Sequence, residues 1–496
     1  MAKEFYGIDL GTTYSCIATI DSDDLVTVIP NKKGALTTPS AVYFDDDNKM
    51  QVGKAAKAHL ADKPENTVVF IKREMSNPDY KVTINGKSYD PVQISSFILR
   101  HLVDFANEKR KNEEGKDPIN DVVITVPAYF GKMERDRTEA AGKMAGLNVL
   151  QLINEPSAAA LSYGRKQQSD KNLLVYDLGG GTFDVSILEF KTGIADVLST
   201  RGDHHLGGVD WDKALAEIAL KKCGGSNFDS LKESEKGMML IAAEECKQEL
   251  SDEDSAVMTF KYKGIQTVEI TRQEFEAATM PLMMKTKLLL DEALEAAQMS
   301  PSDIDEVILV GGSSKMPMVS KVVRDVLGCT PKLVDPDMAV AKGAALTAAQ
   351  ADKGYVEGAM IMGKDKGSRA YGMQTYVTES NGQSHLCVAN LILRNDDQEI
   401  HREFDTFQTY QDGQTQVDFH FYESECEDEY MDIDPDLEIK GRKDTISWGK
   451  SVPKGTPIKI IIDRDKSGRV KVFAECHGAR GEFEIVSPGC GGISMR

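Results

Sequence analysis

The chain has 496 residues, and 59 Lys and Arg against 79 Asp and Glu give it a formal net charge of −20. Such an acidic chain is a poor ligand for nucleic acid, whose phosphates repel it, and it would need a metal ion to hold a polyphosphate. The length allows three or four domains, and a hydrophobic share of 41% is ordinary for a globular protein with a core.

The cysteine spacing and the start of the chain indicate the cellular compartment that we expect for the protein. None of the eight cysteines forms a Cys-x-x-Cys pair, which argues against zinc-binding or thioredoxin-type sites. The start, Met1–Glu4, has no signal-peptide pattern, and no run of about 18 apolar residues exists. We therefore expect a cytoplasmic protein that binds neither membrane nor nucleic acid.

The first third of the chain predicts a sheet covered by helices. Strand-like runs at Phe5–Ala18 and Ser40–Phe44 precede helical periodicity at Gln93–Asn112. Asp121–Pro127 is predicted to be a buried strand that a proline ends, and Met133–Ala145 a helix. A further strand and helix follow, and this alternation favours a wound α/β sheet.

The stretch Leu173–Ser186 is the most informative. An apolar strand ends at Asp177, and Gly179-Gly180-Gly181-Thr182 precede a second alternating strand. This predicts a hairpin whose glycines let backbone N–H groups approach an anion closely. The acid would repel a phosphate, so it implies a divalent cation. Taken alone, the stretch also fits an ordinary Gly-rich hairpin.

The same pattern occurs twice more. Gly7–Ser15 repeats the order of apolar strand, Asp-Leu-Gly, threonine and strand. It precedes Leu173–Ser186 by about the length of one domain. Val307–Ser314 again places a glycine turn after a buried strand. Two acidic hairpins could hold one polyphosphate and its metal between two lobes.

Beyond Gly354 the pattern changes to an all-β region. Short alternating segments such as Gln416–Tyr422 and Val470–Ala474 predict a β-sandwich over residues 370–486. The acidic run Glu423–Asp436 lacks the spacing and glycine of an EF-hand, so we interpret it as a solvated loop rather than a calcium site.

Several motifs resemble the heat-shock protein 70 (Hsp70, DnaK-type) chaperone family, within the actin, sugar-kinase and heat-shock ATPase superfamily. The resemblance is strong over residues 3–352 and weaker to about 486. The segments that carry it are Gly7–Cys16, Val126–Phe130, Ile153–Ala160, Tyr176–Ser186, Val310–Ser313 and Asp335–Ala345.

The resemblance implies a two-lobed actin-like α/β ATPase domain over residues 1–353, a linker over 354–369 and an all-β sandwich over 370–496. It implies ATP or ADP with Mg²⁺ as cofactors, slow ATP hydrolysis, and binding of extended apolar segments of unfolded polypeptides. It also implies a J-domain co-chaperone and a nucleotide exchange factor as partners.

The resemblance also assigns roles to individual residues. Lys72, Glu155, Asp177 and Thr182 would be catalytic, and Asp9 and Asp177 would organise hydrated magnesium. A lysine ammonium can stabilise the charge that develops during phosphoryl transfer. Without the motifs, Lys72 would be interpreted as a solvated surface residue and Glu155 as a helix cap.

Two further sets complete the implied residues. Pro127 and Arg135 match positions that pass the nucleotide state to the peptide domain, although Pro127 also fits the end of a strand. The nucleotide-binding positions are Gly11, Thr12, Thr13, Tyr14, Gly179, Gly180, Gly181, Thr182, Glu244, Lys247, Ser251, Gly311, Gly312, Ser313, Lys315 and Asp337.

The sequence departs from the family pattern in three places. Lys315 stands where an arginine packs on the adenine, and a lysine cannot stack like a planar guanidinium. The linker run Gly358–Lys364 replaces a leucine-rich segment, and no segment matching the helical lid or an acidic tail follows the sandwich. We therefore expect a lidless or truncated member.

Other functions remain open at this point. A metabolite kinase or an actin-like filament protein of the same superfamily would have no use for the C-terminal sandwich. The stronger alternative is a specialised member that binds nucleotide and serves one dedicated partner without general chaperone activity.

Overall fold

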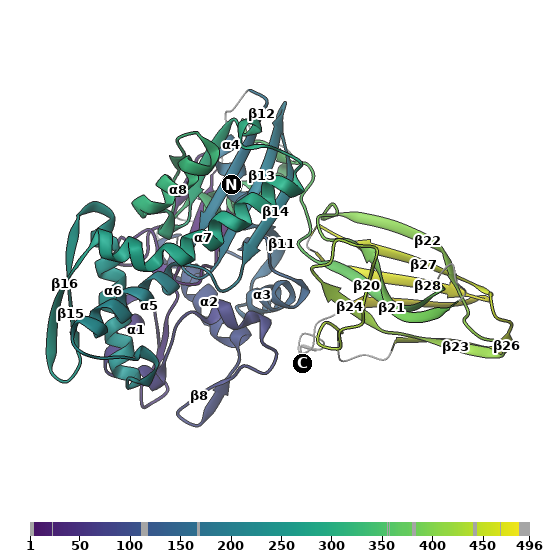
Figure 1. Cartoon of the computed structure of the whole chain (residues 1–496), viewed down its shortest axis with the longest axis horizontal. Coiled ribbons are helices and arrows are strands. Elements are labelled where there is room, and N and C mark those ends of the chain that lie inside the picture. Colours follow the sequence, from purple (N-terminus) through teal and green to yellow (C-terminus); the bar gives the residue numbers. More distant parts are fainter. Residues whose placement is uncertain are drawn as a thin grey trace. The chain divides into compact units, whose positions relative to one another are not determined.

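The computed structural model describes residues 4–21, 23–110, 118–165, 169–354, 356, 358–378, 383–439, 444–466 and 468–485 (Figure 1). The predicted end of the helix at 111–112 and the tail 486–496 lie outside these residues. The chain divides into two compact units. Unit 1 comprises Met1–Ala128 and Thr138–Gly363, and unit 2 comprises Tyr129–Arg137 and Lys364–Arg496.

Unit 1 contains two six-stranded sheets. Their strands are β1 (Phe5–Asp9), β2 (Tyr14–Ile20), β3 (Val26–Val28), β4 (Thr38–Pro39), β10 (Asp121–Val126), β11 (Asn148–Asn154), β12 (Lys171–Leu178), β13 (Phe183–Lys191), β14 (Ile194–Asp203), β17 (Glu306–Val310), β18 (Lys332–Leu333) and β19 (Ile361–Met362).

The two sheets have the same topology. The first runs β3-β2-β1-β10-β11, and the second runs β14-β13-β12-β17-β18 with β19 added beside β14. In each, the strand before the glycine turn (β1 or β12) pairs antiparallel with the strand after it (β2 or β13) and parallel with β10 or β17. In the first sheet β4 also pairs with β2. This shared order agrees with the repeat that the two Asp-Leu-Gly turns predicted. The glycine turns therefore occupy equivalent places in the two halves.

Smaller sheets and helices surround these sheets. The small strands are β5 (Val42–Phe44), β6 (Met50–Val52), β7 (Thr67–Val68), β8 (Val82–Ile84), β9 (Lys87–Tyr89), β15 (Ser255–Lys261) and β16 (Ile265–Thr271). The helices are α1 (Lys54–Ala58), α2 (Pro91–Arg110), α3 (Lys132–Met144), α4 (Glu155–Gly164), α5 (Gly208–Lys222), α6 (Glu233–Asp252), α7 (Arg272–Ala296), α8 (Pro317–Leu327) and α9 (Ala339–Lys353), with short 3₁₀ turns at His59–Ala61, Pro64–Asn66, Ile71–Ser76, Phe228–Ser230, Pro301–Asp303 and Gly312–Lys315.

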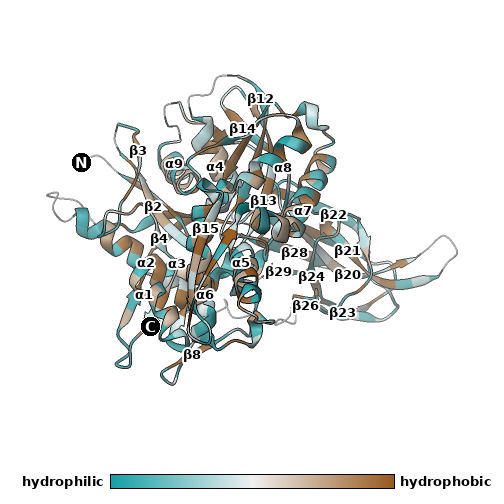
Figure 2. Cartoon of the chain, turned by 60° about the vertical axis from the view of Figure 1, so that its left-hand side comes forward, coloured by the Kyte–Doolittle hydropathy of each residue, from teal (hydrophilic) through white to brown (hydrophobic). Residues whose placement is uncertain are grey.

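Two apolar cores hold the second sheet of unit 1. Its β12 and β13 strands carry buried side chains on both faces, and apolar residues make up much of both strands (Figure 2). One face packs on α5–α8 with Trp211 at the centre, and the other packs on α4 and α9. Within the described residues, no helix is long and apolar enough to cross a membrane.

The segment that precedes unit 2 is partly ordered as a strand. Ile361 and Met362 form β19, which pairs parallel with Ile194 and Ala195 at the edge of the second sheet. Part of the segment predicted as a linker is therefore incorporated into unit 1.

Apart from the segment Tyr129–Arg137, which contains the start of α3, unit 2 is built from strands around one apolar core that includes Ile460, Val472 and Phe483. Two four-stranded sheets run β24-β20-β21-β25 and β22-β27-β28-β29, and β23 pairs with β26. The strands are β20 (Ala370–Thr378), β21 (Ser384–Ile392), β22 (Ile400–Gln408), β23 (Gln414–Phe419), β24 (Phe421–Ser424), β25 (Tyr430–Met431), β26 (Asp444–Val452), β27 (Pro457–Arg464), β28 (Val470–Cys476) and β29 (Ala479–Ile485).

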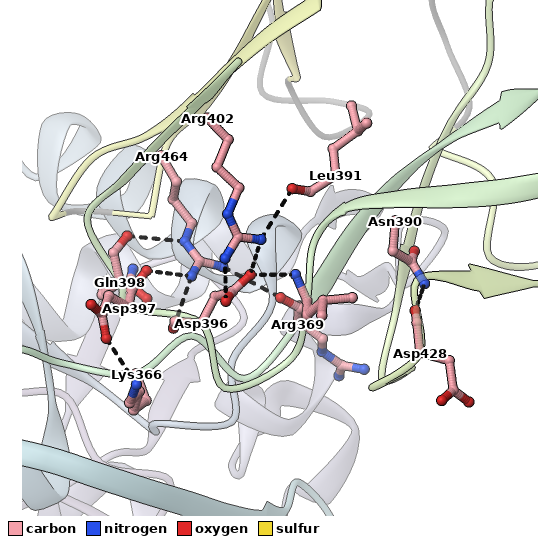
Figure 3. A network of polar contacts seen from close by, with 11 residues as sticks. Lys366, Arg369, Asn390, Leu391, Asp396, Asp397, Gln398, Arg402, Asp428 and Arg464 are labelled. Atoms are coloured by element: carbon pink, nitrogen blue, oxygen red, sulfur yellow. Dashed lines mark hydrogen bonds and ion pairs between the residues drawn. The ribbon is translucent and has the colours of Figure 1, made fainter. Parts of the chain in front are cut away.

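A buried arginine fixes the first residues of this β-domain. Arg464, at the end of β27, is only 3% exposed and donates hydrogen bonds to four main-chain carbonyls (Figure 3). Its Nε reaches Gln398 O at 2.9 Å and its Nη2 reaches Asp397 O at 2.8 Å, with longer contacts to Asp396 O and Arg369 O. Burial lowers the pKa of Arg464 to about 10. The planar guanidinium therefore ties two loops to the sheet.

We predict that Arg464→Lys destabilises the β-domain, because an ammonium cannot reach four carbonyls and leaves buried acceptors unpaired. The expected loss is about 2–4 kcal/mol in the free energy of unfolding. Urea unfolding measures it, and hydrogen exchange of the β22 and β27 amides localises it. The control is Arg480→Lys, since Arg480 is 78% exposed. Equal stability of the two variants would contradict the prediction.

Candidate functional site

A cavity of about 670 Å³ lies in unit 1 between the two hairpin turns and helix α6. The β1–β2 turn (residues 10–13) and the β12–β13 turn (residues 179–182) form its inner end. Every residue predicted to be catalytic, metal-organising or nucleotide-binding lines this cavity, except Gly181. Residues from positions 9 to 340 therefore meet in one place.

The two turns approach each other so closely that larger residues would clash. A Cβ at Gly180 would lie 2.0 Å from Thr13 Oγ1, and a Cβ at Gly181 would lie 2.3 Å from Thr12 Cγ2. Thr13 Oγ1 is buried and has no hydrogen-bond partner within the described residues. A hydroxyl in this position fits a ligand with acceptor oxygens such as a phosphate.

An acidic centre lies beside the turns. Lys72 Nζ is 2.5 Å from Glu155 Oε1, and both side chains are buried. Burial, with repulsion from Glu155, raises the pKa of Asp9 to about 7 and holds the pKa of Asp177 well above its usual range. Thr125 Oγ1 donates to Asp9 Oδ1 at 3.1 Å. The centre holds more negative than positive charge, which suits a divalent cation.

The acids do not form a metal site by themselves. No group of three or more His, Cys, Asp or Glu side chains in the described part of the chain could hold a metal ion. That Asp9 and Asp177 organise magnesium, a metal that usually keeps several waters, through water stays a prediction.

Helix α6 supplies the opposite wall. Glu244 accepts a hydrogen bond from Tyr14 Oη at 2.9 Å and forms an ion pair with Lys57. Lys247 Nζ lies 2.7 Å from Asp212 Oδ1, and burial raises the pKa of Asp212 to about 6 although Lys247 opposes the shift. These contacts make the wall polar.

Lys315 and Asp337 close the outer part of the cavity. Lys315 Nζ lies 2.5 Å from Asp337 Oδ2, so its charge is already paired. Lys315 is the last residue of the 3₁₀ turn Gly312–Lys315, and α8 begins two residues later at Pro317, a residue suited to a first helical position.

Neither of the two predicted coupling residues is among those that line this cavity. Pro127 follows β10 in unit 1, whereas Arg135 belongs to the Tyr129–Arg137 segment of unit 2. The Arg135 side chain is buried and its Nε donates to Phe130 O at 3.0 Å. Their coupling role stays a prediction.

Several side chains that support the site are not identified by any motif in the sequence. Thr125 contacts Asp9 across 116 positions of chain, and Lys57 contacts Glu244 across 187. Arg73 contacts Gly181 O across 108 positions and Asp210 across 137. No local pattern identifies such residues, because their partners are set by how the two sheets pack.

Comparisons with known proteins point to one family. A family model described as "Hsp70 protein" matches residues 5–486. The chain is 38% identical to "Chaperone protein DnaK" of Thermotoga petrophila over 502 residues, covering 98% of this chain and 81% of that protein. It is equally similar to the protein of the same description from Thermosipho melanesiensis, of which it covers 80%.

The raised pKa of Asp9 predicts how ligand-free stability depends on pH. Unfolded, Asp9 ionises near 4, whereas in the folded protein its pKa is about 7. Between these values only the unfolded chain loses the proton, so the free energy of unfolding falls as the pH rises from about 4 to about 7. Asparagine carries no charge and can still accept from Thr125.

We therefore expect Asp9→Asn to stabilise the ligand-free protein at pH 8 by on the order of a few kcal/mol, and to have little effect near pH 4. Urea unfolding in EDTA across this range measures the difference. Asp325→Asn, at an exposed position, is the control. A variant no more stable than wild type at pH 8 would show that Asp9 is not strained by burial.

Proposed function

The chain belongs to the Hsp70 family, and we propose that it binds Mg-ATP in the cavity of unit 1, hydrolyses it slowly, and binds extended polypeptide segments through unit 2. An actin-like ATPase domain of two lobes and a β-sandwich are the architecture of this family, and the chain has both. Chaperones are also what the relatives' descriptions name.

The observation that supports nucleotide binding most is the pairing of two glycine turns around a buried acidic centre. Bound Mg-ATP would supply the phosphoanhydride that is cleaved and the metal that neutralises its phosphates. Thr12 and Thr13 from one turn, and the backbone N–H groups of Gly179–Thr182 from the other, would bind the phosphates. Asp9 and Asp177 would orient the water shell of the metal.

Lys72 and Glu155 would carry the chemistry. The Lys72 ammonium, held by Glu155 at 2.5 Å, would stabilise the charge that develops on the transferring phosphate. Glu155 would orient the attacking water. Tyr14, Glu244, Lys247 and Ser251, with Gly311–Ser313, Lys315 and Asp337, would enclose the nucleoside.

An exposed apolar patch supports polypeptide binding by unit 2. Tyr376 on β20 faces Leu386 on β21, and the Tyr376 ring stacks on Tyr410 with centroids 3.9 Å apart. These three side chains are 48%, 38% and 43% exposed. Exposed apolar groups of this kind mark interaction sites, and a sandwich can accept an extended strand through its backbone.

Further proposals follow from the family. A J-domain co-chaperone and a nucleotide exchange factor would act on unit 1, and Pro127 and Arg135 would couple the nucleotide state to polypeptide binding. A function limited to one dedicated partner has less support, because the relatives named above are described as chaperones.

The proposal is tested first by nucleotide binding and turnover. Saturating Mg-ATP should raise the melting temperature of the protein, because it binds only the folded state. Lys72→Ala should lower the single-turnover hydrolysis rate by about 100-fold and change ATP affinity much less, since the ammonium acts mainly on the transition state. Lys143→Ala, at a 60% exposed lysine, is the control. An unchanged rate for Lys72→Ala would remove Lys72 from the mechanism.

The second test concerns unit 2. Tyr376→Ala should weaken binding of a fluorescent apolar peptide by roughly tenfold, because it removes one face of the exposed patch. Fluorescence anisotropy measures the dissociation constant, and Leu25→Ala, at an exposed position in unit 1, is the control. Equal affinities of the two variants would exclude this patch as the polypeptide-binding surface.

A further inference from the structure

Each carbonyl group of the three glycines in the β12–β13 turn accepts a hydrogen bond from a residue outside the turn. Gly179 O accepts from Gly208 N at 3.0 Å and Gly180 O accepts from Val209 N at 2.8 Å. Gly181 O accepts from Arg73 Nε at 2.9 Å. The first two donors are backbone groups of helix α5. The third is a side chain from the other half of unit 1.

These contacts fix the direction of the following N–H groups. In a trans peptide unit the C=O of one residue and the N–H of the next point in opposite directions. Holding the Gly181 carbonyl therefore directs the N–H of Thr182 away from Arg73, and Thr182 lines the cavity. Arg73 thus sets the orientation of the last peptide plane in the turn.

Arg73 is itself held firmly. Its Nη2 lies 2.6 Å from Asp210 Oδ2 and its Nη1 lies 3.4 Å from Asp210 Oδ1, and its side chain is 14% exposed. Asp210 also accepts from Gly207 N at 2.8 Å at the start of α5. The guanidinium therefore joins the turn and the helix that holds the other two carbonyls.

The backbone that carries Arg73 also carries Lys72. Both residues lie in the 3₁₀ turn Ile71–Ser76, and Phe70 immediately before it has φ 58°. An aromatic residue in this left-handed region is strained, and such strain persists only where surrounding contacts over-determine the backbone. The placement of Lys72 and that of the Gly181–Thr182 peptide are therefore set by one short segment.

We infer that Arg73 is a positioning residue for phosphoryl transfer. It sets the position of the β12–β13 turn in one half of unit 1 relative to Lys72 in the other half. The inference rests on the proposed ATP hydrolysis. Arg73 is not among the residues that line the cavity, so it would not contact a nucleotide bound there. It acts by aiming the Thr182 N–H, and misplacement of such a donor slows catalysis more than it weakens ground-state binding.

The test uses the full chain and Mg-ATP, with variants Arg73→Ala, Arg73→Lys and Asp210→Asn. Arg73→Ala should lower the single-turnover rate by roughly 10–100-fold and change the dissociation constants of Mg-ATP and Mg-ADP by less than about threefold. Arg73→Lys should recover part of the rate, because an ammonium can reach one of the two acceptors.

Asp210→Asn separates this effect from a disturbance of Lys72. Asp210 lies 137 positions from Arg73, so its isosteric change leaves the 3₁₀ turn intact while weakening the hold on the guanidinium. We expect an intermediate rate. Arg324→Ala, at an exposed position on α8, is the control and should match wild type. Thermal unfolding shows that each variant is folded.

Each possible result supports or overturns the inference about Arg73. A slower rate in all three variants at nearly constant affinity supports the inference. A wild-type single-turnover rate in Arg73→Ala overturns the inference. A purely structural role would instead lower the affinities for Mg-ATP and Mg-ADP equally and leave the rate unchanged, and that result also overturns it. Wild-type protein that fails to bind Mg-ATP would instead overturn the proposed function.

Discussion

The structure of unit 1 depends on the close approach of two backbone turns. Gly180 and Gly181 contact Thr13 and Thr12 at distances that leave no space for a Cβ. Because the turns end β1 and β12, the first strands of the two sheets, their contact fixes how one half of the unit meets the other. A bulkier residue at either glycine would separate the acids that line the cavity.

The close approach of the two turns brings several buried carboxylates together, and their mutual repulsion destabilises the folded protein. Asp9, Asp177 and Glu155 lie together with Lys72 among them, and the raised pKa values of the two aspartates express the penalty. A folded protein keeps such an arrangement where it serves binding or catalysis, since replacing the charges would stabilise the empty fold. A cation bound beside these carboxylates would relieve their mutual repulsion.

A second principle operates in both units: arginine side chains hold backbone carbonyls. Arg464 does so for the loops that begin the β-domain, and Arg73 does so for the glycine turn of unit 1. A guanidinium carries five N–H donors spread over a rigid planar fork, so it can bind more acceptors, and acceptors further apart, than the three donors of a lysine ammonium. In both places the carbonyls belong to loops that have no regular strand or helix to pair with them.

The sequence by itself determined which elements form and where the reactive groups lie. Apolar strands that end in Asp-Leu-Gly identified both turns, and the motifs identified the family and the residues that line the cavity. These features are local, since strand periodicity and turn chemistry act over a few residues. The change to short alternating segments beyond Gly354 likewise indicated the β-sandwich.

Only the tertiary structure decided which distant groups support these residues. Arg73 meets Gly181 across 108 positions, and Arg464 meets Gln398 across 66. Thr125, Asp210 and Lys57 acquire their roles in the same way. Such pairings depend on the packing of one sheet against another, and the pKa of Asp9 depends on burial that exists only after folding. Neither leaves a pattern in the chain that a reader of the sequence could find.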